Sequence, residues 1–300
     1  MSKKKLVYIG GWGRSGTTLI SSLLACSLKS VFVGEMRYLW DRALTNDSVC
    51  GCGQPSSKCS LWCGLKDSVL ADEKDYDELV KRSLFSVGSR ARPKQFWTFF
   101  PVVRNLYFRK YKAELKLLNE CYDYILESSE KNIVIDSSKS PFYFSSLLKL
   151  EDYELHFVHV IRDPKGVCAS WKKNKVTGDD LEGKVKFPKY SIFRSCAQWT
   201  FVNFACLLFR NKKNVNYIQV KYEDFAREPE VVLDSIVHDI GEERVVSEPY
   251  VHSISGNPIR FENLKELEIK PDIAWIKILG YWEKTLINLA TKPFFLLSKK

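Results

Sequence analysis

The sequence predicts an α/β fold in three layers, with a central, mainly parallel sheet flanked by helices. Short runs rich in apolar and β-branched residues alternate with stretches of helical character. Such alternation forms βαβ units, which place helices on both faces of a parallel sheet. The 300 residues are 45% hydrophobic, enough for one substantial core, and no linker divides them, so a single domain over 1–300 is expected.

Five apolar runs are the expected strands. They are residues 6–10 (LVYIG), 30–34 (SVFVG), 132–136 (NIVID), 155–161 (LHFVHVI) and 215–220 (VNYIQV). A helix is expected after each strand. These helices are predicted to start near Thr17, at Met36, after Pro141, after Pro164 and near Pro229.

A helical and cysteine-rich insertion, about 45–130, separates the second and third predicted strands. The roughly 95 residues between these strands exceed the usual crossover length. We expect this insertion to act as a substrate lid. It contains a cysteine-rich loop (50–63), a helical stretch near 66–84, a basic aromatic piece at 89–101 (SRARPKQFWTFFP) and a long helix near 104–130.

The charge balance favours anionic partners. There are 46 Lys and Arg against 36 Asp and Glu, a formal net charge of +10. The basic residues are spread along the chain without the regular aromatic interleaving of a strand-binding groove. Phosphorylated cofactors, acidic glycans and anionic lipid all fit this charge, and nucleic acid is the weaker alternative, so no nucleic-acid partner is expected.

The chain start is basic and runs directly into the first predicted strand, so a signal peptide is not expected. Uninterrupted apolar runs of about 18 residues, the length of a membrane span, are also missing from the sequence. We expect a cytoplasmic protein. The end of the chain, PFFLLSKK (293–300), is compatible with peripheral membrane contact.

The loop after the first predicted strand has the composition of a phosphate cradle. Residues 10–18 read GGWGRSGTT, and Gly11 and Gly16 have the spacing of the GxxxxGK[ST] fingerprint. Backbone N–H groups, the positive end of the next helix, and the hydroxyls of Ser15, Thr17 and Thr18 can face an anion. The sequence therefore predicts a P-loop fold, against the alternative of a glycine-rich connecting turn.

The cationic residue of this loop is displaced from its usual place. Thr17 stands where the fingerprint has Lys, and Arg14 lies at the front of the loop. A guanidinium there suits a bridging phosphate–sulfate anhydride. The missing Lys weakens the case for magnesium-dependent phosphoryl transfer.

A second anion site is predicted in HFVHVIRDPKGVCASW (156–171). Arg162 lies at the carboxyl end of a predicted strand, where open α/β sheets bind ligands. Ser170 follows eight residues later, about two helical turns on, and can face the same groove as the first loop. Two anion sites indicate a nucleotide phosphorylated at two places, although Arg-Asp-Pro alone is also a common helix cap with an ion pair.

These two motifs together resemble the paired signature of sulfotransferases that use 3′-phosphoadenylyl sulfate (PAPS). The resemblance, closest to bacterial members, extends to DSSKSP (136–141), YEDFAREPEVVL (222–233) and HSISGNPIR (252–260). It implies an enzyme that transfers a sulfuryl group from PAPS to an acceptor hydroxyl. The product is then adenosine 3′,5′-bisphosphate, and no metal is required. We expect a carbohydrate or glycolipid acceptor.

The resemblance also implies roles for residues. It implies that residues of the loop around Gly16 bind the 5′-phosphosulfate, and that two residues of the second motif bind the 3′-phosphate. A C-terminal loop closes over the nucleotide. The phosphosulfate group is Arg14, Ser15, Gly16, Thr17 and Thr18, the 3′-phosphate group is Arg162 and Ser170, and the closing loop contains Gly256, Asn257 and Arg260.

Three residues are candidates for the general base. Glu35 ends the second predicted strand, and GE before a helix resembles the catalytic Glu of tyrosylprotein sulfotransferases. Asp136 is the second candidate, although an Asp at a strand end often forms an Asx turn. His159 is the third, although a histidine inside a strand is more often a hydrogen-bonded core residue. Lys139 is expected to stabilise charge in the transition state.

The nine cysteines fall into two groups. Four of them, Cys50, Cys52, Cys59 and Cys63, form a CxCx6Cx3C pattern that can bind a structural zinc ion or hold free thiols in a loop packed on Trp62. The other five are expected as small buried apolar residues. They are Cys26, Cys121, Cys168, Cys196 and Cys206.

Two other functions share some of these features. A P-loop kinase acting on a small molecule would use the same fold, but Thr17 replaces its lysine. A non-catalytic protein that binds nucleotides or nucleic acid would account for the charge, and its binding would fall steeply with salt.

Overall fold

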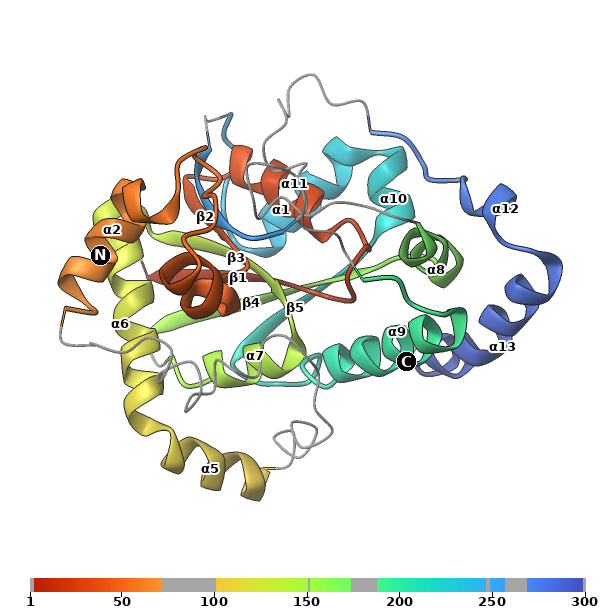
Figure 1. The fold of residues 1–300 in the computed structure, drawn as a ribbon, viewed down its shortest axis with the longest axis horizontal. Helices are drawn as coiled ribbons and strands as arrows, with labels where there is room; N and C mark the ends of the chain where they lie inside the picture. The colour runs from red at the N-terminus through yellow and green to blue at the C-terminus, as the bar shows by residue number, and fades with distance from the viewer. Residues whose placement is uncertain are drawn as a thin grey trace.

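The computed structural model describes residues 3–71, 101–150, 152–173, 188–246, 249–256 and 269–298. Its centre is a six-stranded sheet in the order β5-β4-β1-β3-β2-β6, in which every pair of neighbouring strands is parallel (Figure 1). The strands are β1 Lys4–Gly10, β2 Ser30–Gly34, β3 Ile133–Lys139, β4 Tyr153–Ile161, β5 Val215–Lys221 and β6 Tyr250–Ile254.

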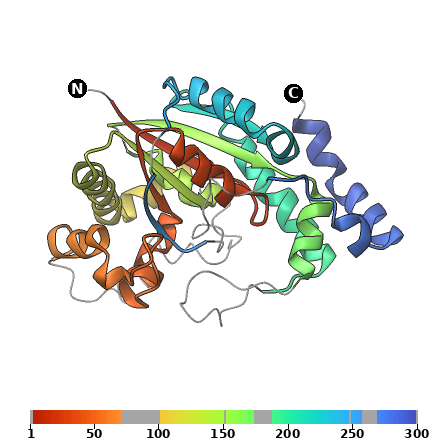
Figure 2. The ribbon, with the colours of Figure 1, turned by 90° about the horizontal axis from the view of Figure 1, so that it is seen from above.

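Helices form a layer on each face of the sheet, as Figures 1 and 2 show. The layer on one face is α1 Thr17–Cys26, α10 Tyr222–Arg227 and α11 Pro229–Asp239. The layer on the other is α6 Lys112–Ser129, α7 Pro141–Leu147 and α9 Ile192–Leu207. The predicted three-layer α/β class is therefore confirmed.

Alternation along β1 explains why both faces carry helices. Leu6 and Tyr8 pack into the core cluster that contains α6 and α7 residues, whereas Val7 and Ile9 pack into the cluster with α1 and α11 residues. All four side chains are fully buried. A strand with two buried faces reads as a continuous apolar run, which is the pattern that predicted it.

The remaining helices pack mainly against other helices. They are α2 Ser60–Ser68, α5 Pro101–Lys110, α8 Pro164–Lys172, α12 Trp275–Ile278 and α13 Tyr281–Ser298. Helix α13 packs along α9 and contacts α8.

Four local features differ from the predictions. In the described part of the helical stretch predicted near 66–84, the helix is α2, which begins at Ser60 and ends at Ser68. The segment from Met36 is not a regular helix: it forms a 3-10 turn, Met36–Tyr38, and then a π-helix, Leu39–Thr45. The backbone N–H of Arg37 donates to the Ser138 hydroxyl at 3.0 Å, a tertiary bond that an isolated helix pattern does not reveal. The long helix near 104–130 is two helices, α5 and α6, interrupted at Tyr111. Strand β6 was not predicted.

The insertion contributes to the main core where it is described. Leu118, Cys121, Tyr122 and Ile125 of α6 are buried in the same cluster as residues of β1 and β3. Trp62 of α2 is also buried there. The stretch 72–100, which holds the basic aromatic piece, lies outside the described residues, so the lid role stays a prediction.

The C-terminal helix α13 is partly buried. Phe294 packs on Trp199 with ring centroids 4.9 Å apart, whereas Leu296 and Leu297 are exposed. Membrane contact through this end stays a prediction. Within the described ranges, the helices are too short or too polar to qualify as a membrane span.

Candidate functional site

The predicted site residues meet at the carboxyl edge of the sheet. Strands β4, β1, β3 and β2 are consecutive neighbours, so the segments that follow them lie side by side. Gly10 of β1 pairs with Lys139 of β3 on one side and with His159 of β4 on the other. The Gly11 N–H donates to the Lys139 carbonyl at 3.2 Å. This edge is where open parallel sheets bind their ligands.

The loop after β1 needs glycine at two positions for steric reasons. Gly11 has φ 135°, and a Cβ there would lie 2.5 Å from the Val160 carbonyl oxygen. Gly16 has φ 85°, and a Cβ there would lie 2.3 Å from the Tyr222 ring. Arg14 adopts φ 71°, an unusual conformation for a residue with a side chain.

Hydroxyl groups line the loop and the first turn of α1. Ser15, Thr17 and Thr18 are all buried. Within the described residues, the Ser15 Oγ has no hydrogen-bond partner. A buried hydroxyl of this kind at a helix N-terminus fits a bound anion, which would accept its hydrogen bond.

The structure joins the two predicted anion motifs directly. The Arg14 Nε donates to the Ser170 Oγ at 3.1 Å, and the Arg162 Nη1 donates to the Arg14 carbonyl at 2.8 Å. Burial, and then the neighbouring Arg162, lower the pKa of Arg14 to about 10, which still leaves it charged at neutral pH. Two guanidinium groups that are electrostatic neighbours favour an anion beside them.

Arg162 has two further partners that the sequence did not indicate. Its Nη2 forms an ion pair with Asp272, and its guanidinium lies over the Tyr222 ring, 4.6 Å from the centroid. Asp163 caps α8 by accepting from the Lys165 N–H at 2.8 Å. The helix cap and ion pair are therefore present, in the same place as the contact between the two motifs.

An aromatic group lies beside the loop. The Trp171 indole donates to the Gly13 carbonyl at 3.3 Å, and its ring lies 5.9 Å from that of Trp12. Tyr190 stacks on Trp171 with centroids 4.6 Å apart. Flat rings of this kind can stack on a nucleobase. Trp12 and Trp171 lie inside the two motifs, and this position is the signal that could have identified them.

Glu35 lies between two cations just beyond β2. It is buried, its Oε1 pairs with the Lys139 ammonium, and its Oε2 accepts from the Arg37 guanidinium at 3.1 Å. Arg37 also donates to the Tyr38 hydroxyl at 2.8 Å. The structure thus brings the predicted Glu35 and Lys139 together. Arg37 was missed, although a charged residue two positions from Glu35 is a usable signal.

The charge state of this cluster follows from its geometry. Burial alone would raise the pKa of Glu35, but Lys139 and then Arg37 outweigh it, so the pKa lies below its ordinary value. Burial lowers the pKa of Lys139, and the Glu35 carboxylate opposes that effect. Glu35 is therefore ionised at neutral pH and can accept a proton.

The other two base candidates have structural partners. Asp136 accepts from the Tyr122 hydroxyl at 2.5 Å and from the Ser138 N–H at 2.7 Å. Burial raises the pKa of Asp136 to about 6. His159 bonds to the Tyr217 hydroxyl at 2.6 Å and to Asn203 at 2.8 Å, and is fully buried. Asp136 therefore forms an Asx-type turn, and His159 is a hydrogen-bonded core histidine.

The end of β6 reaches the same edge. The Glu35 N–H donates to the Ile254 carbonyl at 2.8 Å. A Cβ added at Gly256 would lie 3.6 Å from the Glu35 Oε1 and 3.9 Å from the Thr18 Oγ1. Gly256 is thus close to the loop after β1, and the closing role of its segment stays a prediction. Asn257 and Arg260 lie outside the described residues.

The cysteines are arranged differently from the pattern in the sequence. Cys50, Cys52 and Cys59 gather around His252 of β6, whereas Cys63 lies 3.6 Å from the Asp67 carboxylate, outside this group. The predicted set of four cysteine ligands is therefore corrected. Cys63 lies in the first turn of α2, and its sulfur contacts Asp67, one turn further along the same helix. Of the five expected buried cysteines, Cys26 is only half-buried. The other four, Cys121, Cys168, Cys196 and Cys206, are buried.

Comparison with solved structures gives weak global similarity over most of the chain. A sulfotransferase domain of the Synechococcus PCC 7002 olefin synthase is 18% identical, with a TM-score of 0.49, 98% of this chain and 96% of that chain covered. A sulfotransferase domain of the curacin biosynthetic pathway is 17% identical, with a TM-score of 0.48 and coverages of 96% and 97%. Sulfotransferase STF1 of Mycobacterium tuberculosis H37Rv is 13% identical, with a TM-score of 0.43 and coverages of 83% and 70%.

Sequence comparison is more decisive. Among curated proteins, no sequence matches the chain. A family model described as the sulfotransferase family matches residues 7–245, which include the loop after β1, Glu35, Lys139 and the second anion motif. The match covers well over half of the chain, and the chain therefore belongs to the sulfotransferase family of transferase enzymes.

Proposed function

We propose that this protein transfers a sulfuryl group from PAPS to the hydroxyl of an acceptor. The observation that carries the proposal is the direct bond between the Arg14 guanidinium and the Ser170 hydroxyl, with Arg162 bonded to the Arg14 carbonyl. This contact puts two anion-binding motifs into one site. A donor with a 5′-phosphosulfate and a 3′-phosphate matches such a pair.

The chain's own groups fit the donor. The buried Ser15 hydroxyl, the loop N–H groups and the N-terminus of α1 would hold the 5′-phosphosulfate. Arg162 and Ser170 would hold the 3′-phosphate, and Trp12 and Trp171 offer rings to the adenine. Arg162 would then exchange its pairing with Asp272 for pairing with the phosphate.

Glu35 is proposed as the general base. It would take the proton from the acceptor hydroxyl as the new oxygen–sulfur bond forms and the bridging oxygen–sulfur bond of the donor breaks. Lys139 and Arg14 would stabilise the charge that grows on the bridging oxygen of the leaving adenosine 3′,5′-bisphosphate. Lys139 is well placed to do so because it already lies between Glu35 and the loop after β1.

For the acceptor we propose a carbohydrate or glycolipid hydroxyl. The support is compositional: the basic aromatic stretch 89–101 and the net charge of +10 suit sugars and acidic glycans. Tyr281 and Trp282 on α13 are strongly exposed and can stack on a sugar ring. Screening of acceptors with labelled PAPS, once donor binding is established, would test this class.

Calorimetric titration of adenosine 3′,5′-bisphosphate, 5′-AMP and ATP tests the donor site. We expect strong preference for the bisphosphate, lost in Arg162→Ala. Arg244→Ala is the matched control, because Arg244 pairs with Asp234 and Glu230 at α11 instead of lining the site. Equal binding of the three nucleotides, or tighter binding of ATP, would contradict the proposal and favour a kinase.

A further inference from the structure

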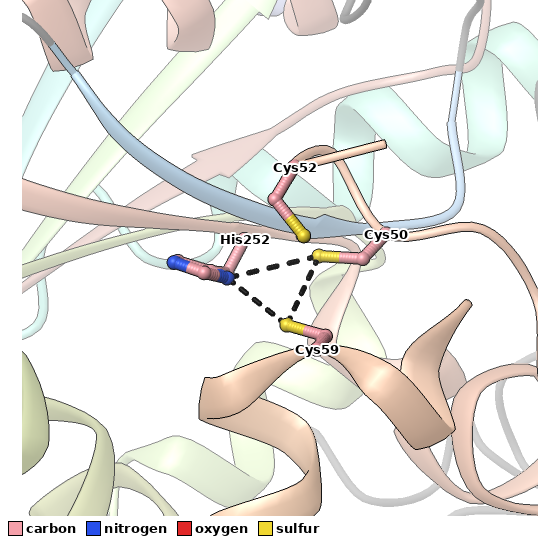
Figure 3. A group of neighbouring side chains, drawn as sticks. All are labelled: Cys50, Cys52, Cys59 and His252. Atoms are coloured by element: carbon pink, nitrogen blue, oxygen red, sulfur yellow. Dashed lines mark hydrogen bonds between the residues drawn. The ribbon is translucent and has the colours of Figure 1, made fainter. Parts of the chain in front are cut away.

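Four potential metal ligands meet between the cysteine-rich loop and strand β6. Cys50, Cys52 and Cys59 come from one loop, and His252 comes from a strand about two hundred residues later (Figure 3). Their ligand atoms all lie within 4.8 Å of one another. The Cys59 Sγ is 3.0 Å from the His252 Nδ1, the Cys50 Sγ is 3.9 Å from that nitrogen, and the two sulfurs are 3.6 Å apart.

These separations are close to those of a tetrahedral zinc site. With zinc–sulfur bonds of about 2.3 Å, the edges of a tetrahedron between two sulfurs are about 3.8 Å. The Cys50–Cys59 separation of 3.6 Å is close to this value. The two sulfur–nitrogen distances, 3.9 Å and 3.0 Å, lie on either side of the about 3.6 Å expected for a sulfur–nitrogen edge. Three thiolates and one imidazole are a known ligand set for structural zinc.

The backbone holds the two segments together before any ion binds. Cys50 forms an antiparallel bridge with Ile254, and the Gly51 N–H donates to the Ser253 carbonyl at 2.9 Å. Gly51 is favoured by this close approach, because a Cβ there would lie 2.9 Å from the Ser253 backbone nitrogen. The ligands are therefore presented by fixed backbone, which reduces the entropy cost of binding an ion.

Burial shields most of the cluster from water. Cys50, Cys59 and His252 are buried, so water has limited access to three of the four ligands.

We propose that Cys50, Cys52, Cys59 and His252 bind one structural zinc ion, a role separate from sulfuryl transfer. With four protein ligands the ion has no open position for substrate or water, so it would act on stability. It would fasten the cysteine loop to β6, whose end continues to Gly256 beside Glu35 and Thr18. The zinc would thus fix the strand that leads into the donor site.

A disulfide between Cys50 and Cys59 is the main rival explanation. It would use two of the thiols, and it would not account for the Cys52 sulfur and the His252 ring nitrogen lying within 4.8 Å of them. A single ion accounts for all four. The two explanations also differ in a measurable way, since a disulfide removes two hydrogen atoms from the chain whereas zinc displaces thiol protons and leaves the sulfurs reduced.

The first test is metal analysis of the intact chain, purified under reducing conditions without chelators. We expect one equivalent of zinc by elemental mass spectrometry. In cobalt-loaded protein we expect the intense visible absorption of tetrahedral thiolate coordination. Absence of stoichiometric zinc, even after incubation with zinc chloride and desalting, would overturn the proposal, as would a Cys50–Cys59 disulfide by non-reducing peptide mass analysis.

Variants assign the ligands. Cys59→Ser and His252→Asn should lower zinc content and the affinity for zinc at least tenfold, whereas His252→Cys should retain the ion with a cobalt spectrum shifted towards four-sulfur coordination. Cys63→Ser is the matched control, because it removes a thiol near the cluster that lies outside it. Loss of zinc in Cys63→Ser, or unchanged zinc in both Cys59→Ser and His252→Asn, would contradict the assignment. Bisphosphate binding measured in parallel separates this result from the proposed donor site.

Discussion

At the scale of single residues, Glu35 is the group on which the proposed chemistry depends. It lies between Lys139 and Arg37 and is ionised at neutral pH, because these cations hold its pKa below the ordinary value. The ionised Glu35 carboxylate therefore contributes to the stability of the folded protein above pH 4.5. This contribution is lost as the pH falls through the lowered pKa of Glu35.

Replacement of Glu35 by Gln should lower kcat/KM about 100- to 10,000-fold, because a positioned base typically contributes that much. Affinity for adenosine 3′,5′-bisphosphate should stay within about threefold, since Glu35 is not proposed to touch it. Steady-state kinetics with the best available acceptor, together with titration of the bisphosphate, measures both quantities. Glu230→Gln on the exposed surface of α11 is the control. Full activity of Glu35→Gln would exclude Glu35 as the base.

Asp272 competes with the donor for Arg162. Its carboxylate pairs with the Arg162 Nη2, and it also accepts from the Ala274 N–H at 3.0 Å. Asp272→Asn keeps an acceptor for Ala274 but removes the charge, so bisphosphate should bind up to about fivefold more tightly, equivalent to about 1 kcal/mol. Calorimetry of this variant against Asp234→Asn measures the difference. Weaker binding would show that Asp272 helps to hold the nucleotide.

At the scale of an element, the loop after β1 depends on close backbone packing. Gly11→Ala should lower the free energy of unfolding by about 2–3 kcal/mol and weaken nucleotide binding, because the new Cβ would meet the Val160 carbonyl at 2.5 Å. Gly241→Ala is the matched control, since Gly241 has φ 74° but its Cβ would meet only the Lys5 ammonium, at 3.8 Å.

In Gly241→Ala, backbone strain without a steric clash should lower the free energy of unfolding by only about 1 kcal/mol. Urea unfolding of both variants, followed by circular dichroism, gives the two values. Equal destabilisation of the two would mean that the packing of Gly11 on β4 is not what constrains the loop.

At the scale of the whole molecule, stability should depend on pH through buried histidine. Burial lowers the pKa of His159 to about 4, below the ordinary 6.5, so the unfolded chain binds the proton more readily. Its contribution is fully present above pH 6.5 and is lost as the pH falls towards 4. Between pH 7 and 5 this amounts to about 2 kcal/mol of unfolding free energy.

Urea midpoints at pH 7 and 5, for wild type and His159→Gln, test this linkage. The wild type should lose about 2 kcal/mol more than the variant over that interval. His238→Gln is the control, because His238 is strongly exposed on α11. A variant with the same pH dependence as wild type would show that His159 is not the group responsible.

The sequence alone determined the class of fold and five of the six strands. Strands such as β1 and β4 are buried on both faces, and a continuous apolar run is a local signal. The sequence also located the two motifs predicted to bind anions, since a glycine-rich turn before a helix and an Arg at a strand end are recognisable without neighbours. Resemblance to sulfotransferases rested on these motifs and agrees with the family match over residues 7–245.

Only the tertiary structure decided which of these residues meet. The Glu35–Lys139 pair depends on β2 lying next to β3, and the Arg162–Asp272 pair joins residues far apart in the chain. His252 joins the cysteines only because β6 pairs with β2, and β6 has too short an apolar run to be recognised alone. Local patterns specify elements, whereas contacts between distant side chains depend on strand order, which the spacing of residues along the chain does not encode.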